Sequence, residues 1–241
     1  MTDAQHDATA TGAEDSTGDI AERLLDAALV HVPFDGWTEA CFRAAIADTG
    51  IDPALARAVC PRGALDLALA YHARGDLAML ERLKVTDLSA MRFRDRIAAA
   101  VRFRLEAADR EVVRRGATLF ALPHHAAEGA RAIWNTCDLI WTALGDSSDD
   151  VNWYTKRATL SGVYSSTVLY WLGDTSAGHQ ATWAFLDRRI EDVMRIETLK
   201  ARVRENPALK PLLAVPNWFL GHIKAPARRP GSDLPGSLSR R

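Results

Sequence analysis

Helical spacing of apolar residues runs through most of the chain, and this periodicity constrains the fold more than any other feature. In the segments 123–144 and 176–204, apolar side chains recur every three or four residues, which places them on one helix face. The sequence has no run in which β-branched residues alternate with polar ones, the pattern of a strand. We therefore expect an all-α fold, in which helices bury these faces against one another.

The order of the segments predicts four parts along the 241 residues. Residues 1–19 are rich in Ala, Thr, Gly and Asp and have little to bury, which indicates a disordered acidic tail. Residues 20–62 are expected to form three short helices and a closing turn, and residues 63–204 a body of longer helices. Residues 205–241 combine apolar and basic residues and are expected to form an amphipathic tail.

The composition argues against several classes of protein. A net charge of -1 gives no bulk attraction to nucleic acid, and 48% hydrophobic residues suit an ordinary globular domain. Cys41, Cys60 and Cys137 are isolated, without the spacing of a zinc site or a disulfide framework. No apolar run approaches the roughly 20 residues that span a bilayer, and the chain starts without a secretory or organellar leader. We expect a protein of the reducing cytoplasm.

The segment from Asp149 to Arg157 places two large aromatic residues and two cations at the start of a predicted helix. Trp153, Arg157, Leu160 and Tyr164 follow one another at spacings of four, three and four, so they share one helix face. Arg157 could bind a phosphate through its planar guanidinium, while Trp153 and Tyr164 cover an acyl or isoprenoid chain. Core packing of the aromatic residues beside a solvated arginine explains the same spacing, so both interpretations stay open here.

Two tryptophans, Trp134 and Trp141, lie on one apolar helix face. Together with Leu160 and Tyr164 they are candidates for the lining of an apolar pocket, although each would serve equally in an ordinary core. The apolar face of 176–204 could close a homodimer through paired terminal helices, and packing within one subunit would explain it as well.

The residue patterns of common enzymes are missing. His124 and Glu128 are four residues apart and share a helix face, but no second such pair completes a metal site in a bundle. The sequence also lacks the Gly-x-Ser-x-Gly nucleophile motif and the glycine-rich phosphate loops. We expect a protein that is not an enzyme and holds neither a metal nor a cofactor.

Several motifs together resemble the lipid-binding accessory proteins of ubiquinone biosynthesis, the family of the ninth Coq protein. The resemblance covers about residues 20–204, and its most specific part is Asp-Val-Asn-Trp-Tyr-Thr-Lys-Arg-Ala at 150–158. Supporting motifs are Leu-Leu-Asp-Ala-Ala-Leu at 24–29, Gly-Trp-Thr at 36–38, Ala-Ile-Trp at 132–134 and Thr-Trp-Ala-Phe-Leu at 182–186.

The resemblance implies a fold like that of TetR regulators, a homodimer, and a pocket for an isoprenoid quinone precursor or a phospholipid. Such a protein presents its lipid to the demethoxyubiquinone hydroxylase without catalysing the reaction itself. By the same resemblance, Arg157 would contact a lipid phosphate, whereas Trp153 and Tyr154 would lie in the patch that binds the hydroxylase.

A TetR-type transcriptional regulator that senses a small apolar ligand is the alternative. Residues 20–62 would then be the DNA-binding head, but the predicted recognition helix carries Arg57 as its single cation. Phosphate contacts supply most of the affinity for DNA, so one arginine gives little binding. We expect a helix-turn-helix that is kept for packing and does not bind nucleic acid.

The tail after the last long helix predicts contact with a membrane surface, because aromatic and apolar residues lie between cations. The candidate contact residues are Trp218, Phe219, Leu220, Ile223 and Lys224. Docking of this tail on its own domain is the alternative. With the family resemblance, the tail predicts a peripheral protein on the inner face of the bacterial cytoplasmic membrane.

Overall fold

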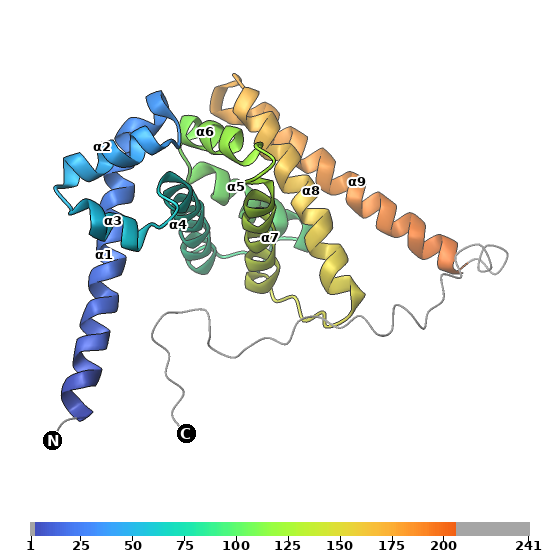
Figure 1. Ribbon diagram of the computed structural model, residues 1–241. Coiled ribbons are helices and arrows are strands. Elements are labelled where there is room, and N and C mark those ends of the chain that lie inside the picture. The colour runs from blue at the N-terminus through green and yellow to red at the C-terminus, as the bar shows by residue number, and fades with distance from the viewer. Residues whose placement is uncertain (1–2, 206–241) are drawn as a thin grey trace.

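The computed structural model describes the backbone of residues 3–205 and the side chains of residues 17–195, and its regular structure there is helical (Figure 1). The helices are α1 (Asp3–Asp35), α2 (Glu39–Thr49), α3 (Pro53–Val59), α4 (Ala64–Val85), α5 (Phe93–Glu106), α6 (Arg110–Phe120), α7 (Ala126–Ala143), α8 (Val151–Gly173) and α9 (Gln180–Glu205), with a short 3-10 helix η1 (Ala177–His179) before α9. The predicted all-α fold is confirmed.

Polar side chains determine where several helices begin. Thr38, Asp52, Asp109 and Asp150 each accept a hydrogen bond from a backbone amide in the first turn of α2, α3, α6 and α8, respectively. The α2 helix ends at Gly50, whose φ of 65° is left-handed and costs glycine little. These local signals place the ends of the helices independently of tertiary packing.

The first helix begins earlier than the sequence pattern predicts. We expected residues 1–19 to be disordered, but α1 starts at Asp3 and continues without a break to Asp35. Four alanines in residues 4–13 have the highest intrinsic preference for helix, which is a local reason for this longer helix.

Helices α1–α3, the head, share a core with the first half of α4 and one residue of α6. The buried apolar residues of this core are Leu24, Leu25, Ala28, Val32, Trp37, Cys41, Phe42, Ala45, Ile51, Ala56, Cys60, Ala64, Leu67, Ala68 and Val112. In the head, α2 and α3 lie against α1 (Figure 1).

Helices α4–α9, the body, surround a second core. Its buried residues are Met79, Leu83, Ile97, Ala100, Val101, Leu105, Cys137, Ile140, Leu160, Val163, Tyr164, Trp171, Leu172, Trp183, Leu186 and Ile190. Helices α8 and α9 lie side by side along one flank of the body (Figure 1). The buried core of the body therefore joins residues from α4, α5, α7, α8 and α9.

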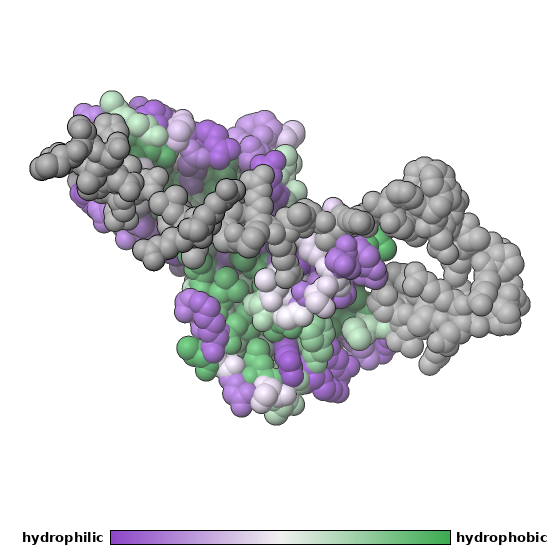
Figure 2. Space-filling model, turned by 90° about the horizontal axis from the view of Figure 1, so that it is seen from below, coloured by the Kyte–Doolittle hydropathy of each residue, from purple (hydrophilic) through white to green (hydrophobic). Residues whose placement is uncertain are grey.

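The surface of the molecule mixes apolar and charged areas when it is seen from below (Figure 2). Within the part of the chain that the structure describes, no helix is long and apolar enough to cross a bilayer. The residues predicted to contact a membrane, Trp218, Phe219, Leu220, Ile223 and Lys224, lie outside the described residues.

Candidate functional site

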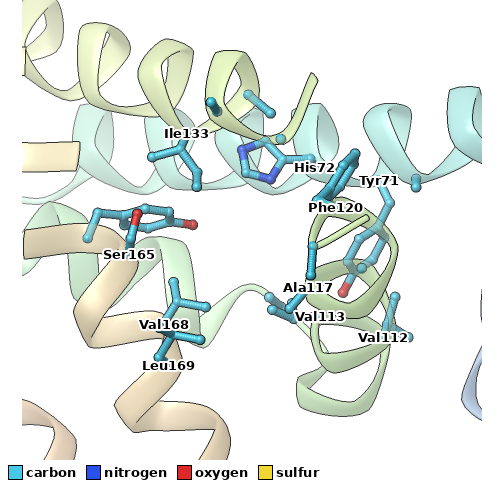
Figure 3. A pocket seen from close by; sticks show the side chains of 18 of the residues that line it. Tyr71, His72, Val112, Val113, Ala117, Phe120, Ile133, Ser165, Val168 and Leu169 are labelled. Atoms are coloured by element: carbon cyan, nitrogen blue, oxygen red, sulfur yellow. The ribbon is translucent and has the colours of Figure 1, made fainter. Parts of the chain in front are cut away.

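A cavity of about 420 Å³ lies between α4, α5, α6, α7 and α8. Figure 3 shows its wall on α6 facing side chains of α8. The labelled apolar residues of these two walls are Val112, Val113, Ala117, Phe120, Val168 and Leu169, and Ile133 on α7 adds a third side. Small-molecule sites have volumes of roughly 300–1,000 Å³ and mostly apolar walls, so the cavity has the size and lining of a ligand site.

A buried ion pair, formed by Arg104 and Asp76, lies at one side of this cavity. Arg104 on α5 is 3% exposed, and its Nε donates to Oδ1 of Asp76 on α4 at 2.6 Å. Its Nη2 donates to the carbonyl oxygen of His72 at 2.9 Å. The Thr136 hydroxyl on α7 donates to the same carboxylate at 2.9 Å, so the network joins three helices.

The guanidinium of Arg104 fits only because residue 75 has no side chain. A Cβ at Gly75 would lie 2.4 Å from Nη1 and 2.6 Å from Cζ of Arg104. Because real Cβ atoms do not approach other heavy atoms so closely, an alanine there would displace the arginine. The glycine in α4 therefore creates the space that a buried arginine needs.

Burial changes the acid–base behaviour of two cavity residues. It lowers the pKa of His72, against the opposing influence of Asp76. It raises the pKa of Tyr164 to about 12, so that this hydroxyl is protonated at neutral pH. Both side chains are thus uncharged under ordinary conditions.

A separate groove of about 510 Å³ lies on the other side of α8, between the start of α5, the end of α7 and α9. Apolar residues such as Phe93, Trp141 and Leu160 line it beside polar ones such as Asp146 and Lys156. The Trp141 indole donates to the carbonyl oxygen of Lys156 at 3.1 Å, which holds the ring across the groove. The groove is more polar than the cavity.

Arg157 is fully buried and belongs to neither space. Its Nη1 donates to Oδ2 of Asp146 at 3.0 Å and to the carbonyl oxygen of Trp153 at 3.1 Å, and its Nε pairs with Asp138. The guanidinium carbon lies 4.1 Å from the centre of the Trp153 ring. Its Nη2 has no hydrogen-bond partner among the described residues, but the guanidinium is paired with two carboxylates and lines neither space, so the contact of Arg157 with a lipid phosphate stays a prediction without support from this placement.

Three aromatic residues form a patch in front of this arginine, which we call the aromatic patch. The ring of Trp153 lies 5.9 Å from that of Trp134 and 4.8 Å from that of Tyr154. Trp153 is 9% exposed, whereas Tyr154 is 36% exposed. Arg157 therefore supports the patch from below through its contact with the Trp153 ring, and Tyr154 is the more exposed ring of the pair.

Comparison with known proteins gives two kinds of sequence match. The COQ9 family model matches residues 126–197. The "Ubiquinone biosynthesis protein COQ9, mitochondrial" of Drosophila melanogaster is 31% identical over 186 residues, which cover 75% of this chain and 57% of that protein. The protein of the same name from Rattus norvegicus is 31% identical over 190 residues, 76% of this chain and 61% of that protein. The chain belongs to the COQ9 family. Its match spans about three fifths of the length of these relatives.

The fold of this COQ9 family member resembles that of TetR regulators. The crystal structure of a TetR transcriptional regulator from Nitrosomonas europaea superposes with a TM-score of 0.59 and 19% identity, over 72% of this chain and 97% of that one. The predicted TetR-like architecture is confirmed. In the candidate recognition helix α3, Arg57 pairs with Glu39 and lies 4.7 Å above the Phe42 ring, so its charge is engaged within the head.

The names of the relatives correct the expected location. Both COQ9 proteins above are named as mitochondrial. These names contradict the predicted location at the inner face of a bacterial cytoplasmic membrane, and that prediction is wrong. The reducing-cytoplasm argument rested on isolated cysteines, which do not distinguish one reducing compartment from another.

The five residues predicted to bind lipid do not come together in this COQ9 family member. Tyr164 lines the cavity, whereas Trp141 and Leu160 line the groove. Trp134 lies in the aromatic patch, and Arg157 lies behind that patch. A shared helix face did not imply a shared site, because the 23 residues of α8 pass both the groove and the cavity.

Most of the cavity wall was not predicted from the sequence. The α6 residues Val113, Gly116, Ala117 and Phe120 line it, and none of them stood out as a candidate. Small residues on an apolar helix face were the available signal, since they leave volume between packed helices. The pair His124 and Glu128 lies in a separate depression, and the described residues hold no group of three or more possible metal ligands.

Proposed function

We propose that this chain is a lipid-binding accessory protein of ubiquinone biosynthesis. In this proposal, the cavity between α4–α8 holds the apolar chain of an isoprenoid quinone precursor or of a phospholipid. The observation that carries the proposal is the cavity of about 420 Å³ with apolar walls on α6 and α8. Burial of apolar surface is worth about 25 cal/mol per Å², so such a cavity can compete with a bilayer for an isoprenoid chain.

The aromatic patch is the proposed docking site for the demethoxyubiquinone hydroxylase. Aromatic residues are enriched where interfaces gain most of their energy, and Tyr154 is 36% exposed at the surface of the patch. Replacing Tyr154→Ala should weaken binding of the purified hydroxylase about 10-fold or more. Tyr170→Ala is the matched control, because that ring is 40% exposed near the other end of α8. Undiminished binding by the Tyr154 variant would remove the patch from the proposal.

Three further parts of the proposal come from the sequence. The chain acts without catalysing the reaction, because its sequence lacks the nucleophile and phosphate-loop motifs of common enzymes. It pairs with a second copy through α8 and α9. Residues 205–241 contact a membrane surface, and most of them lie outside the described residues.

A TetR-type regulator that senses an apolar ligand is less well supported. The fold admits it, but the single cation of α3, Arg57, is held by Glu39. A DNA-binding head needs free cations that reach phosphates, and this helix does not supply them.

Organic extraction of the purified full chain, followed by mass spectrometry, tests the proposal directly. We expect near-stoichiometric lipid from the wild-type protein. Ala117→Trp, which fills the cavity, should lose most of it, whereas Thr155→Trp, which fills the groove, should keep it. A folded wild-type chain without lipid would contradict the proposal, as would a loss confined to Thr155→Trp.

A further inference from the structure

The cavity has a polar end that apolar walls alone do not require. Arg104, Tyr164, Ser165 and His72 border it, whereas most of the other lining residues are apolar. Arg104 and Tyr164 are only 3% and 4% exposed, so they are interior groups beside an interior space. A few polar groups placed at one end of an apolar pocket orient the ligand that enters it.

The charge at this end is already balanced. The ion pair of Arg104 with Asp76 has side chains that are 4% and 6% exposed, and the Thr136 hydroxyl donates to the same carboxylate. An anionic headgroup would have to share Arg104 with Asp76. One negative charge would then remain buried without a full partner, which is costly in a medium of low dielectric constant.

Hydrogen-bond donors nevertheless remain at this end. Arg104 uses Nε for Asp76 and Nη2 for a backbone carbonyl, and no hydrogen bond joins its Nη1 to any residue that the structure describes. The Tyr164 hydroxyl likewise has no hydrogen-bond partner among the described residues, and it stays protonated because burial raises its pKa to about 12. Two donors thus border an electrically neutral site.

We propose that the polar end selects an uncharged amphiphile whose head carries an acceptor oxygen, such as a ring carbonyl or an ester, and that it rejects anionic headgroups. This inference rests on the proposed function of the cavity and narrows its ligand. Arg104 and Tyr164 donate to the head oxygen, and the apolar chain lies between α6 and α8. Asp76 is not part of the cavity lining, but it determines the specificity because its negative charge balances the positive charge of Arg104.

Three probes that share one chain and differ only in the head test this selection. Farnesyl acetate offers an uncharged acceptor, farnesyl phosphate offers an anion, and farnesene has no polar head. Equilibrium dialysis with the full chain should give the tightest binding for farnesyl acetate, with farnesyl phosphate weaker by about 10-fold or more. Farnesene should lie between them, since it gains apolar burial without meeting a charge penalty.

Two substitutions separate the donors from the charge balance. Tyr164→Phe removes only a hydroxyl, and we expect it to weaken farnesyl acetate about 3- to 10-fold while leaving farnesene unchanged. Asp76→Asn leaves the charge of Arg104 unbalanced and should invert the order, so that farnesyl phosphate binds more tightly than farnesyl acetate. Tyr170→Phe, on the same helix but away from the cavity lining, is the matched control and should change neither affinity.

The outcomes distinguish this inference from the proposed function. Equal binding of all three probes, or tightest binding of farnesyl phosphate to the wild-type chain, would overturn the selection and leave the cavity as a lipid site. Failure of all three probes to bind would overturn both. If Asp76→Asn does not fold, the comparison of Tyr164→Phe with Tyr170→Phe still decides, because an unchanged affinity for farnesyl acetate would contradict the assigned donors.

Discussion

Arg104 and Arg157 are both buried arginines of the body, but they serve different spaces. Each pairs with a carboxylate from another segment of the chain: Arg104 with Asp76, and Arg157 with Asp138 and Asp146. Arg104 borders the cavity, whereas Arg157 lies under the Trp153 ring and touches neither cavity nor groove. Burial and ion pairing alone therefore do not show that an arginine binds a ligand. The deciding feature is whether the arginine borders a cavity that its remaining hydrogen-bond donors can face.

The largest expected effect comes from breaking the Arg104 pair. In Arg104→Met, Asp76 keeps only its neutral hydrogen-bond partners in the interior, so we expect a loss of about 3–5 kcal/mol in the free energy of unfolding. Urea denaturation followed by circular dichroism measures it. Arg195→Met is the control, because that side chain is 70% exposed in its pair with Glu191 and should matter by about 0–1 kcal/mol. Equal losses in both variants would contradict the account.

Breaking the Arg157 cluster should cost less. In Arg157→Met, Asp146 keeps its ion pair with Lys156 at 2.7 Å, and Asp138 is 40% exposed and can be solvated. We expect a loss of about 1.5–3 kcal/mol, together with a change in the near-ultraviolet circular dichroism of the aromatic patch. A loss larger than that of Arg104→Met would reverse the comparison between the two arginines.

Two glycines test how tightly Arg104 is packed, because an added methyl group would meet Arg104 at one of them and no other atom at the other. Gly75→Ala would push a methyl group against Arg104 and should destabilise the fold by about 1–3 kcal/mol. Gly162→Ala, in the middle of α8 with no atom within 4 Å of the added Cβ, should stabilise it by about 0.5–1 kcal/mol. Thermal unfolding of both variants should therefore give shifts of opposite sign. A shift of the same sign would mean that Arg104 moves aside freely.

The smallest expected effect is a pH dependence of the Arg157 cluster. Burial alone raises the pKa of Asp146, but hydrogen bonds from Lys156, Ser148 and Arg157 outweigh it and hold the pKa well below the ordinary value of 3.8. The carboxylate therefore contributes stability that is fully present above about pH 4 and is lost as the pH falls further. Urea midpoints at pH 6 and pH 3 should fall less in Asp146→Asn than in the wild-type protein. An identical fall would exclude Asp146 as a source of acid sensitivity.

The sequence was sufficient for the fold but not for the cavity. Apolar periodicity and the caps at Asp52, Asp109 and Asp150 are local signals, so the helices could be predicted without knowing how they pack. Whether Arg157 faces a ligand depends on carboxylates 11 and 19 positions away in the chain, whose approach only tertiary structure reveals. The same holds for the cavity wall on α6, where the informative feature is the volume that Gly116 and Ala117 leave open.

Hydrogen exchange with and without bound ligand tests the division between the two arginines most directly. The full chain, stripped of lipid, would be compared before and after loading with farnesyl acetate. We predict slower exchange in α6 and in residues 163–169 of α8, which border the Arg104 end of the cavity, and no change in residues 146–157 around Arg157. Protection confined to residues 146–157 would contradict the account, because it would place the ligand beside the arginine that we assign to the aromatic patch.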